Sequence, residues 1–363
     1  MNARIVVGQG SCGLAAGAGA VYSALESKLT PEVNASLGIT GCVGICYLEP
    51  IVDVYAPNGD LFRCVQVKPE HAETIVNAAE SGNFELLKDL VIKETDILVS
   101  CSDYHIFKQM KMTRKQALDH YLATIADAFV AGVVPRCHLE DITRADFYGF
   151  VVPFAEALEL LCEEYKIPVK IRACDTMGYG VSFPGAVPPR SVQGIIYGIM
   201  TYAGIPSELI EWHGHNDFYK AVANSTTAWL YGCYGVNTSL FGIGERTGNT
   251  PLEAMIFEYA QLRGTLDGMD TTVITELAEY YEKEIGYQIP PRTPFVGKNF
   301  NVTRAGIHAD GLLKNEEIYN IFDTEKFLNR PVLVAISNTS GLAGIAHWIN
   351  TYYRLKGDDQ IQK

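Results

Sequence analysis

The sequence predicts an α/β protein: an N-terminal α/β domain, part of a parallel (β/α) barrel and a small, mainly helical C-terminal subdomain. Two observations indicate the barrel. From about residue 94, short apolar strands alternate with helical segments, and polar residues gather where each strand ends. The 363 residues, 48% of them hydrophobic, suffice for several cores. We therefore expect domains at 1–93, 94–265 and 266–363.

The first domain opens with an apolar run at 3–8 that is typical of a buried strand. A helical pattern follows through Val21, Leu25 and Leu29. Two more strands flank a turn at 57–59, and we expect helices near 69–82 and 84–91.

Five strands of the barrel are expected, at 97–102, 135–141, 169–176, 209–215 and 235–242. The clearest helix between them begins at Thr113, which forms a capping box with Gln116, and ends at Gly132. Because a closed barrel of this kind needs eight strands, five predict an incomplete one. A further helix is expected at 271–285.

Charge and composition exclude several classes of protein. The net charge is −13 without a basic run, which argues against nucleic acid and anionic membranes as partners. No stretch of 18 apolar residues predicts a membrane span, and the first residues do not read as a signal peptide. Nine cysteines, an odd number spread along the chain, fit a reducing cytoplasm better than a disulfide framework.

The strongest motif contains His213 and His215 at the end of a strand. Residues two apart on a strand share a face, so both imidazoles can reach one divalent metal ion. Asn249, which closes a Gly-rich loop after the last strand, could add a carbonyl oxygen. Two hydrogen-bonded structural histidines are the alternative.

A second group lies on one face of the strand at 135–141: Arg136, His138 and Glu140. The functional interpretation is an arginine that binds a substrate carboxylate beside a carboxylate that acts as a general base. An ion-pair network is the alternative. Thr176 and His105 follow other strands and are further candidates for substrate binding.

Two more sets are weaker. His308 and Tyr319 lie beyond the barrel, where a histidine is more often structural than catalytic. Three cysteines near strand ends match no zinc spacing and are interpreted as small core residues: Cys101, Cys137 and Cys174.

Together, the motifs HGHND, GIGERTGNTPLE and GIHADG resemble the homocitrate and isopropylmalate synthase family, over about 94–363. Further segments, such as RCHLEDITRADFYGF and EWHGHNDFYKAV, look most similar to its Re-type citrate synthases. The resemblance implies a metal-dependent condensation of acetyl-CoA with a 2-oxoacid, oxaloacetate giving citrate. It also implies a homodimer that exchanges its C-terminal segments.

The resemblance assigns roles to these residues. His213, His215 and Asn249 would hold the metal, for which Mn²⁺ is our choice among Mn²⁺, Co²⁺, Mg²⁺ and Zn²⁺. Arg136 would bind the oxoacid carboxylate with help from Thr176. Glu140, His308 and Tyr319 would deprotonate the acetyl methyl group.

The chain departs from the family at its start. No Arg-Asp dipeptide supplies the metal-binding Asp of the family's first strand. Instead, residues 1–93 resemble a thioredoxin-like [2Fe–2S] ferredoxin domain, in which Cys42 and Cys46 match two cluster ligands. Cys12 could be a third, but the fourth is missing, so we expect a fold without a cluster.

Three functional hypotheses follow: an acyltransferase, a non-catalytic remnant or subunit that lacks the first barrel strands, and an iron–sulfur electron-transfer protein.

Overall fold

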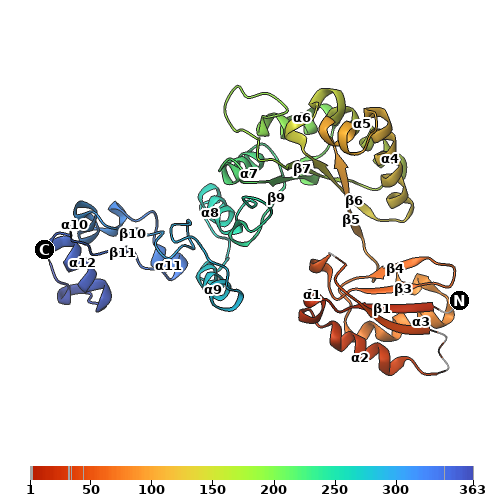
Figure 1. The fold of residues 1–363 in the computed structure, drawn as a ribbon, viewed down its shortest axis with the longest axis horizontal. Helices are drawn as coiled ribbons and strands as arrows, with labels where there is room; N and C mark the ends of the chain where they lie inside the picture. Colours follow the sequence, from red (N-terminus) through yellow and green to blue (C-terminus); the bar gives the residue numbers. More distant parts are fainter. Residues whose placement is uncertain (1–2, 32, 34, 44, 339, 363) are drawn as a thin grey trace. The chain divides into compact units, whose positions relative to one another are not determined.

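The computed structural model describes residues 3–31, 33, 35–43, 45–338 and 340–362 (Figure 1). Its contacts divide the chain into two compact units. One contains Met1–Ile97, Asp119–Cys137 and Leu160–Lys170, and the other contains Leu98–Leu118, His138–Glu159 and Ile171–Lys363. The predicted α/β class with a parallel sheet is confirmed.

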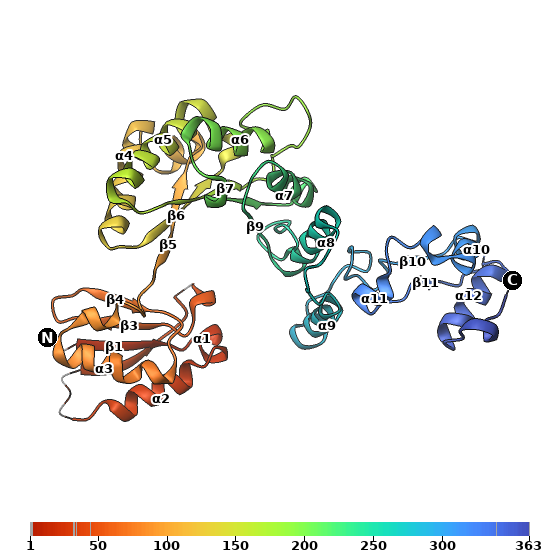
Figure 2. The ribbon, with the colours of Figure 1, turned by 180° about the vertical axis from the view of Figure 1, so that it is seen from behind.

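The N-terminal part of the first unit is a four-stranded sheet in the order β2-β1-β3-β4. Strand β1 pairs in parallel with β2 and antiparallel with β3, and β3 pairs antiparallel with β4. Helices α2 and α3 run along one face of this sheet in Figures 1 and 2. The element bounds are β1 Ala3–Gly8, α1 Ser11–Ala15, α2 Ala18–Lys28, β2 Ala35–Thr40, β3 Val52–Tyr55, β4 Leu61–Cys64 and α3 Ala72–Ser81.

Two details of this region differ from expectation. Strand β2 was not predicted, because its sequence is short, contains Gly38 and lacks a buried side chain. The helix expected near 84–91 is wrong: only a 3₁₀ turn, Phe84–Leu87, forms there. The following residues pair with the sheet instead, since Val65 donates to the carbonyl of Leu90 and Val91 bridges Cys64.

A second sheet has the order β5-β6-β7-β8-β9 and corresponds to the five expected barrel strands. β8 pairs in parallel with both β7 and β9. Figures 1 and 2 show α5 and α6 on one side of β6 and β7. The bounds are β5 Glu94–Ser100, α4 Arg114–Val130, β6 Val134–Glu140, α5 Val152–Tyr165, β7 Lys170–Asp175, α6 Val192–Ala203, β8 Ile210–Gly214, α7 Ala221–Leu230, β9 Gly235–Asn237 and α8 Leu252–Arg263.

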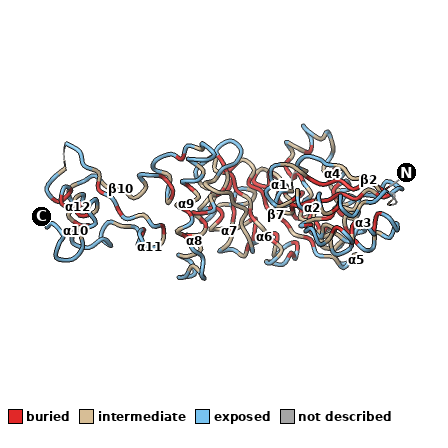
Figure 3. The backbone as a smooth tube through the Cα atoms, turned by 90° about the horizontal axis from the view of Figure 1, so that it is seen from below, coloured by how far each residue is buried: buried red, intermediate tan, exposed pale blue. Residues whose placement is uncertain are grey.

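The strands of this sheet alternate between a buried and a half-exposed face. Along β6, Cys137 and Leu139 are buried, whereas Arg136, His138 and Glu140 are only partly covered. Figure 3 colours the buried residues of the described chain red. The half-exposed face of β6 therefore carries its charged and polar side chains.

The capping box predicted for α4 is present: Thr113 N–H donates to Gln116 Oε1 at 2.9 Å, and Gln116 N–H donates to Thr113 Oγ1 at 3.2 Å. Gly132 follows the helix with φ +70°. No helix among the described residues is both long and apolar enough to cross a membrane.

The C-terminal elements are mostly helical, as expected. A small parallel pair, β10 and β11, lies among them. The bounds are α9 Val273–Tyr280, β10 Val302–Thr303, α10 Gly306–Lys314, α11 Thr324–Leu328, β11 Leu333–Val334 and α12 Leu342–Tyr352.

Candidate functional site

The candidate site lies at the carboxyl ends of the barrel strands. Ser100 ends β5, Glu140 ends β6, Asp175 ends β7 and His213 is the last residue but one of β8. Neighbouring strands in a parallel sheet point the same way, so these ends meet at one edge. That edge is where enzymes with this architecture hold their substrates.

Two imidazoles meet at this edge, as the sequence predicted. Nε2 of His213 and Nε2 of His215 are 3.1 Å apart, and their rings are inclined by 82°. Two nitrogens bound at right angles to one ion, each about 2.1 Å from it, would be about 3.0 Å apart. A single divalent cation can therefore contact both rings.

Asn237 fixes the first of these rings. Its Oδ1 lies 2.7 Å from Nδ1 of His213, and register places the two residues side by side on β9 and β8. A hydrogen on Nδ1 leaves the lone pair of Nε2 free for a metal. Burial lowers the pKa of His213 to about 4, so the ring is neutral at neutral pH. Sequence reasoning missed Asn237, because its place beside His213 comes from the register between β8 and β9.

Asn249 is the third predicted ligand, and its backbone bridges that of His215. Its Oδ1 is buried without a hydrogen-bond partner among the described residues. The loop before it is closed by a hydrogen bond from Asn249 N–H to the carbonyl of Gly242. Gly248 has φ +91°, and a Cβ there would lie 2.0 Å from that carbonyl oxygen, so this position requires glycine.

These donors fit a divalent cation. An unpaired buried amide oxygen is costly unless something binds it, and a hard or borderline cation does so. Within the described part of the chain, no three side chains of His, Cys, Asp and Glu are grouped closely enough to hold a metal. The donors that these residues offer would be two imidazoles and one amide, and a cation held by them would keep coordination positions for a chelating ligand.

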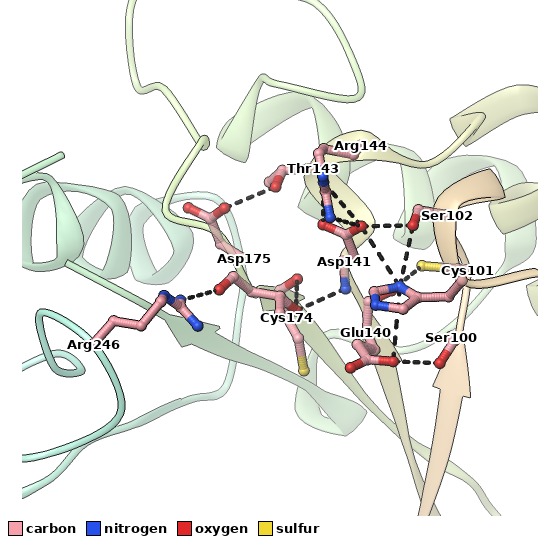
Figure 4. Close-up of polar contacts among 12 residues, drawn as sticks. Ser100, Cys101, Ser102, Glu140, Asp141, Thr143, Arg144, Cys174, Asp175 and Arg246 are labelled. Carbon is pink, nitrogen blue, oxygen red and sulfur yellow. Dashed lines mark hydrogen bonds and ion pairs between the residues drawn. The ribbon is translucent and has the colours of Figure 1, made fainter. Parts of the chain in front are cut away.

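Glu140, the predicted base, is held by two neighbours from β5 and the segment after it. Ser100 Oγ donates to its Oε2, and Nδ1 of His105 lies 3.9 Å from the same oxygen (Figure 4). The carboxylate thus sits beside a hydroxyl and an imidazole, at the half-exposed end of β6. His105, which was predicted to lie at the site, thus lies next to Glu140.

Asp141 connects the loops around Glu140, and sequence reasoning did not single it out. It is fully buried and has φ +62°. Its carboxylate accepts hydrogen bonds from Ser102 Oγ at 2.5 Å and from Arg144 Nε at 2.8 Å. Figure 4 shows these bonds converging on the carboxylate.

Thr176 forms hydrogen bonds to other loops of the protein through its side chain and its carbonyl. Its Oγ1 accepts the backbone N–H of Asp141 at 2.8 Å, and its carbonyl accepts Arg246 Nη2 at 2.5 Å. Arg246 in turn pairs with Asp217 at 2.8 Å. The loops after β6, β7 and β8 and the GIGERTGN loop are therefore joined through Thr176.

Arg136 lies at the opposite end of β6 from Glu140. They are four positions apart, which is about 13 Å along a strand. Its guanidinium pairs with Glu94, and with Asp96 at 3.3 Å. These contacts are those of the ion-pair alternative, and the structure does not bring Arg136 to the carboxyl end of its own strand.

His138 occupies the middle of the same strand. Its Nε2 lies 3.2 Å from Nη1 of Arg172, which pairs with Glu211 at 2.6 Å. This charged layer lies one step along the strands from Glu140 and His213. His138 therefore lies within this charged layer and not at the strand end itself.

His308 and Tyr319 are brought together in the C-terminal subdomain. Their ring centroids are 4.3 Å apart, and Nδ1 of His308 lies 3.1 Å from Thr303 Oγ1. Gly311 makes room for this pair, because a Cβ there would lie 2.7 Å from the Tyr319 ring. The pairing of the two residues follows the sequence interpretation.

Cysteines fall into two classes. Cys42 and Cys46 are exposed, with sulfurs 3.5 Å apart, and Cys12 is also exposed. The three strand-end cysteines are buried, as their interpretation as core residues requires: Cys101, Cys137 and Cys174. Burial raises the pKa of each of these three thiols, which disfavours the thiolate form that binds metals.

Comparison with known proteins gives a consistent result. A sequence model of the HMGL-like family matches residues 61–280. The Citrate (Re)-synthase of Clostridium kluyveri is 65% identical over 285 residues, which cover 78% of this chain and 63% of that protein. The Citrate (Re)-synthase of Syntrophus aciditrophicus is 57% identical over 285 residues, covering 78% of this chain and 45% of that protein. The chain thus spans less than two thirds of the length of these relatives.

A thioredoxin-like [2Fe–2S] ferredoxin from Aquifex aeolicus is 27% identical over 25% of this chain and 96% of its own, with a TM-score of 0.22.

Proposed function

The chain belongs to the HMGL-like family, and we propose that it carries the metal-binding edge and C-terminal subdomain of an enzyme that condenses acetyl-CoA with oxaloacetate to give citrate. The observation that carries this proposal is the imidazole pair, with nitrogens 3.1 Å apart. Asn249, whose backbone bridges that of His215, has a buried side-chain oxygen without a hydrogen-bond partner among the described residues. Two relatives named as citrate (Re)-synthases support the choice of reaction. Other 2-oxoacids are the alternative acceptors.

His213, His215 and Asn249 would hold the cation, and Mn²⁺ is our choice. Bound there, a divalent ion would polarise the keto group of the oxoacid and neutralise the negative charge that develops on its oxygen. Asn237 orients the ring of His213 for this purpose, and burial keeps the ring neutral.

Glu140 is the proposed base. It would take a proton from the methyl group of acetyl-CoA, and the electron pair of that C–H bond would form the new bond to the keto carbon. The π pair of the keto group would move to its oxygen, which then takes up a proton to become the hydroxyl of the product. Water then cleaves the thioester, releasing CoA and citrate. Ser100 and His105 orient the carboxylate through the contacts described above. His308 and Tyr319 would assist this proton transfer.

Substrate carboxylates need donors at the same edge. His105 lies there and fits this role. Thr176 lies there too, but its Oγ1 accepts the Asp141 N–H and donates to the Cys174 carbonyl, so its hydroxyl would have to leave that carbonyl to bind a substrate. Arg136 and His138 were proposed for the same role from the sequence, and in that role Arg136 would have to leave Glu94 and Asp96. Their ion pairs favour support of the sheet instead.

We propose that residues 1–93 form a separate thioredoxin-like domain without a cluster, followed by the barrel segment 94–265 and the subdomain 266–363. We also propose a cytoplasmic homodimer. The missing barrel strands and the missing Asp ligand keep the non-catalytic subunit as the competing function, because five strands do not close a barrel.

One assay tests the reaction directly. Purified protein is incubated with acetyl-CoA, oxaloacetate and Mn²⁺, and free thiol is followed over time. We expect CoA release that a His213→Ala variant lacks. Equal rates for the two proteins would reject catalysis by this chain, and a metal-free monomer in solution would then favour the subunit.

A further inference from the structure

The loop that carries Asn249 contains a turn that its own sequence does not favour. Between β9 and α8, the chain turns at Phe241 and Gly242, which have φ values of +57° and +67°. Glycine adopts this left-handed conformation readily, but for a bulky residue such as phenylalanine it costs about 1–3 kcal/mol. Contacts with the rest of the protein must therefore hold the backbone of Phe241 in place.

Glu253 supplies such a contact. It is the second residue of α8, it is 3% exposed, and its Oε2 accepts the backbone N–H of Phe241 at 3.0 Å. The Phe241 ring contacts Tyr281 edge-on, with centroids 5.0 Å apart. The carboxyl group thus holds the backbone of the turn, and Tyr281 holds its side chain. Phe241 directly precedes the segment GIGERTGNTPLE and Glu253 ends it, so this one hydrogen bond closes the whole loop.

The same turn positions Asn249. The carbonyl of Gly242 accepts the Asn249 N–H at 2.9 Å, and the N–H of Ser239, before the turn, donates to the carbonyl of Thr250 at 3.1 Å. The backbone of Asn249 also bridges that of His215. Asn249 is therefore held between the turn and the second imidazole, and a change in the turn displaces the residue that offers the amide oxygen.

We propose that Glu253 is a positioning residue for the metal site: it fixes the turn at Phe241 and Gly242, and the turn holds Asn249 where a divalent cation can reach its side chain. Glu253 itself accepts a hydrogen bond from the backbone and is not a metal ligand. The inference rests on the proposed function only in taking the two imidazoles and Asn249 as the metal-binding groups. Residues that orient metal ligands without touching the metal contribute strongly to its affinity.

The test compares Mn²⁺ binding by three variants of the full chain, measured by calorimetry. Glu253→Leu removes the acceptor, so we expect the Kd for Mn²⁺ to rise about tenfold. Glu253→Gln keeps an oxygen that can accept the Phe241 N–H, and its Kd should stay within about twofold of the wild type. The control is Glu258→Leu, which removes a carboxylate of the same helix that accepts the hydroxyl of Thr226, on α7, at 2.7 Å. This control should lose stability and keep the wild-type Kd.

Hydrogen exchange of the metal-free protein measures the state of the loop independently. We expect the amides of Phe241 and Asn249 to exchange faster in Glu253→Leu than in the wild type, whereas the amides of α7 keep their rates. Thermal unfolding shows whether each variant is folded. If Glu253→Leu does not fold, Glu253→Asp takes its place, because it keeps a carboxylate but draws it back by one methylene. Its Kd for Mn²⁺ should rise about threefold or more.

Equal Mn²⁺ affinity in Glu253→Leu and Glu258→Leu overturns the inference, and so does a Glu253→Gln variant that loses as much affinity as Glu253→Leu. A wild type that binds no Mn²⁺ overturns the metal site and this inference with it. Otherwise the two proposals fail separately. If His213→Ala abolishes Mn²⁺ binding but Glu253→Leu binds as the wild type does, only the role of Glu253 is lost. If Glu253→Leu weakens Mn²⁺ binding but the wild type releases no CoA from acetyl-CoA, only the reaction is lost.

Discussion

The backbone N–H of Asp141 donates to Thr176 Oγ1 at 2.8 Å, which joins the end of β6 to the end of β7. The same aspartate accepts hydrogen bonds from Ser102, after β5, and from Arg144. Three adjacent strand ends are thus fixed relative to one another by one buried residue. This arrangement makes Glu140, the residue before Asp141, part of a rigid edge rather than of a mobile loop.

Replacing Thr176 tests this connection. Thr176→Val keeps the shape of the side chain but leaves the Asp141 N–H without an acceptor, so we expect the free energy of unfolding to fall by about 1–3 kcal/mol. Urea denaturation measures the change. Thr176→Ser keeps the oxygen and should retain most of the stability. Equal losses in the two variants would show that the methyl group, not the hydrogen bond, matters.

Asn237 is predicted to control metal affinity without touching the metal. In Asn237→Ala the hydrogen-bond partner of His213 Nδ1 is lost, so the ring is free to turn and change tautomer. We expect Mn²⁺ affinity to drop by about 10- to 100-fold, measured by calorimetry. His120→Ala, which removes an exposed histidine of α4, is the matched control and should bind Mn²⁺ as the wild type does. Unaltered Mn²⁺ affinity in Asn237→Ala would contradict a metal site in which Asn237 orients the ring of His213.

Because of Glu253, we expect the stability of the protein to depend on pH. This residue of α8 is 3% exposed and accepts the N–H of Phe241, and burial raises its pKa. A carboxyl group whose pKa is raised on folding binds more protons in the folded state. Its contribution to stability is therefore greatest below its unfolded pKa and declines as the pH rises through the folded value.

Glu253→Gln keeps an oxygen that can accept the Phe241 N–H and carries no charge. We expect it to be more stable than the wild type at pH 7, with a difference that shrinks as the pH falls toward 4.5. Urea denaturation between pH 4.5 and 7.5 measures this. A difference that does not change with pH would mean that Glu253 is not buried in its charged form.

A variant of Arg136 distinguishes two interpretations of this residue, ion pairing within the protein and binding of the substrate carboxylate. Because it pairs with Glu94 and Asp96, we expect Arg136→Met to reduce the free energy of unfolding by about 1–3 kcal/mol and to leave the KM for oxaloacetate unchanged. Steady-state kinetics and denaturation of the same preparation measure both. A large rise in KM with unchanged stability would instead support binding of the substrate carboxylate by Arg136.

The sequence predicted the parts of this protein that depend on local pattern. The alternation of strands and helices predicted the five barrel strands. The two-residue spacing of His213 and His215 predicted that their side chains lie on the same face of a strand. What it could not give depends on contacts between distant segments. Asp141 is important because its φ is positive and three loops converge on it, and neither property is visible in a Glu-Asp dipeptide. The carboxylates that pair with Arg136 likewise lie on β5, the preceding strand. The sequence around Arg136 was therefore compatible with both ion pairing and substrate binding.

The last prediction concerns the contact between His308 and Tyr319. A Cβ on Gly311 would lie 2.7 Å from the Tyr319 ring, so Gly311→Ala must push that ring away from His308. Gly306, in the first turn of the same helix, has nothing closer than 3.9 Å, so Gly306→Ala adds the same atom without a clash. If the pair assists proton transfer, CoA release should fall about tenfold or more in Gly311→Ala, as in Tyr319→Phe, and stay near the wild-type rate in Gly306→Ala. Circular dichroism confirms that both helices form, since alanine favours a helix over glycine. Wild-type rates in Gly311→Ala would remove Tyr319 from the proposed mechanism, because the ring could not have kept its place.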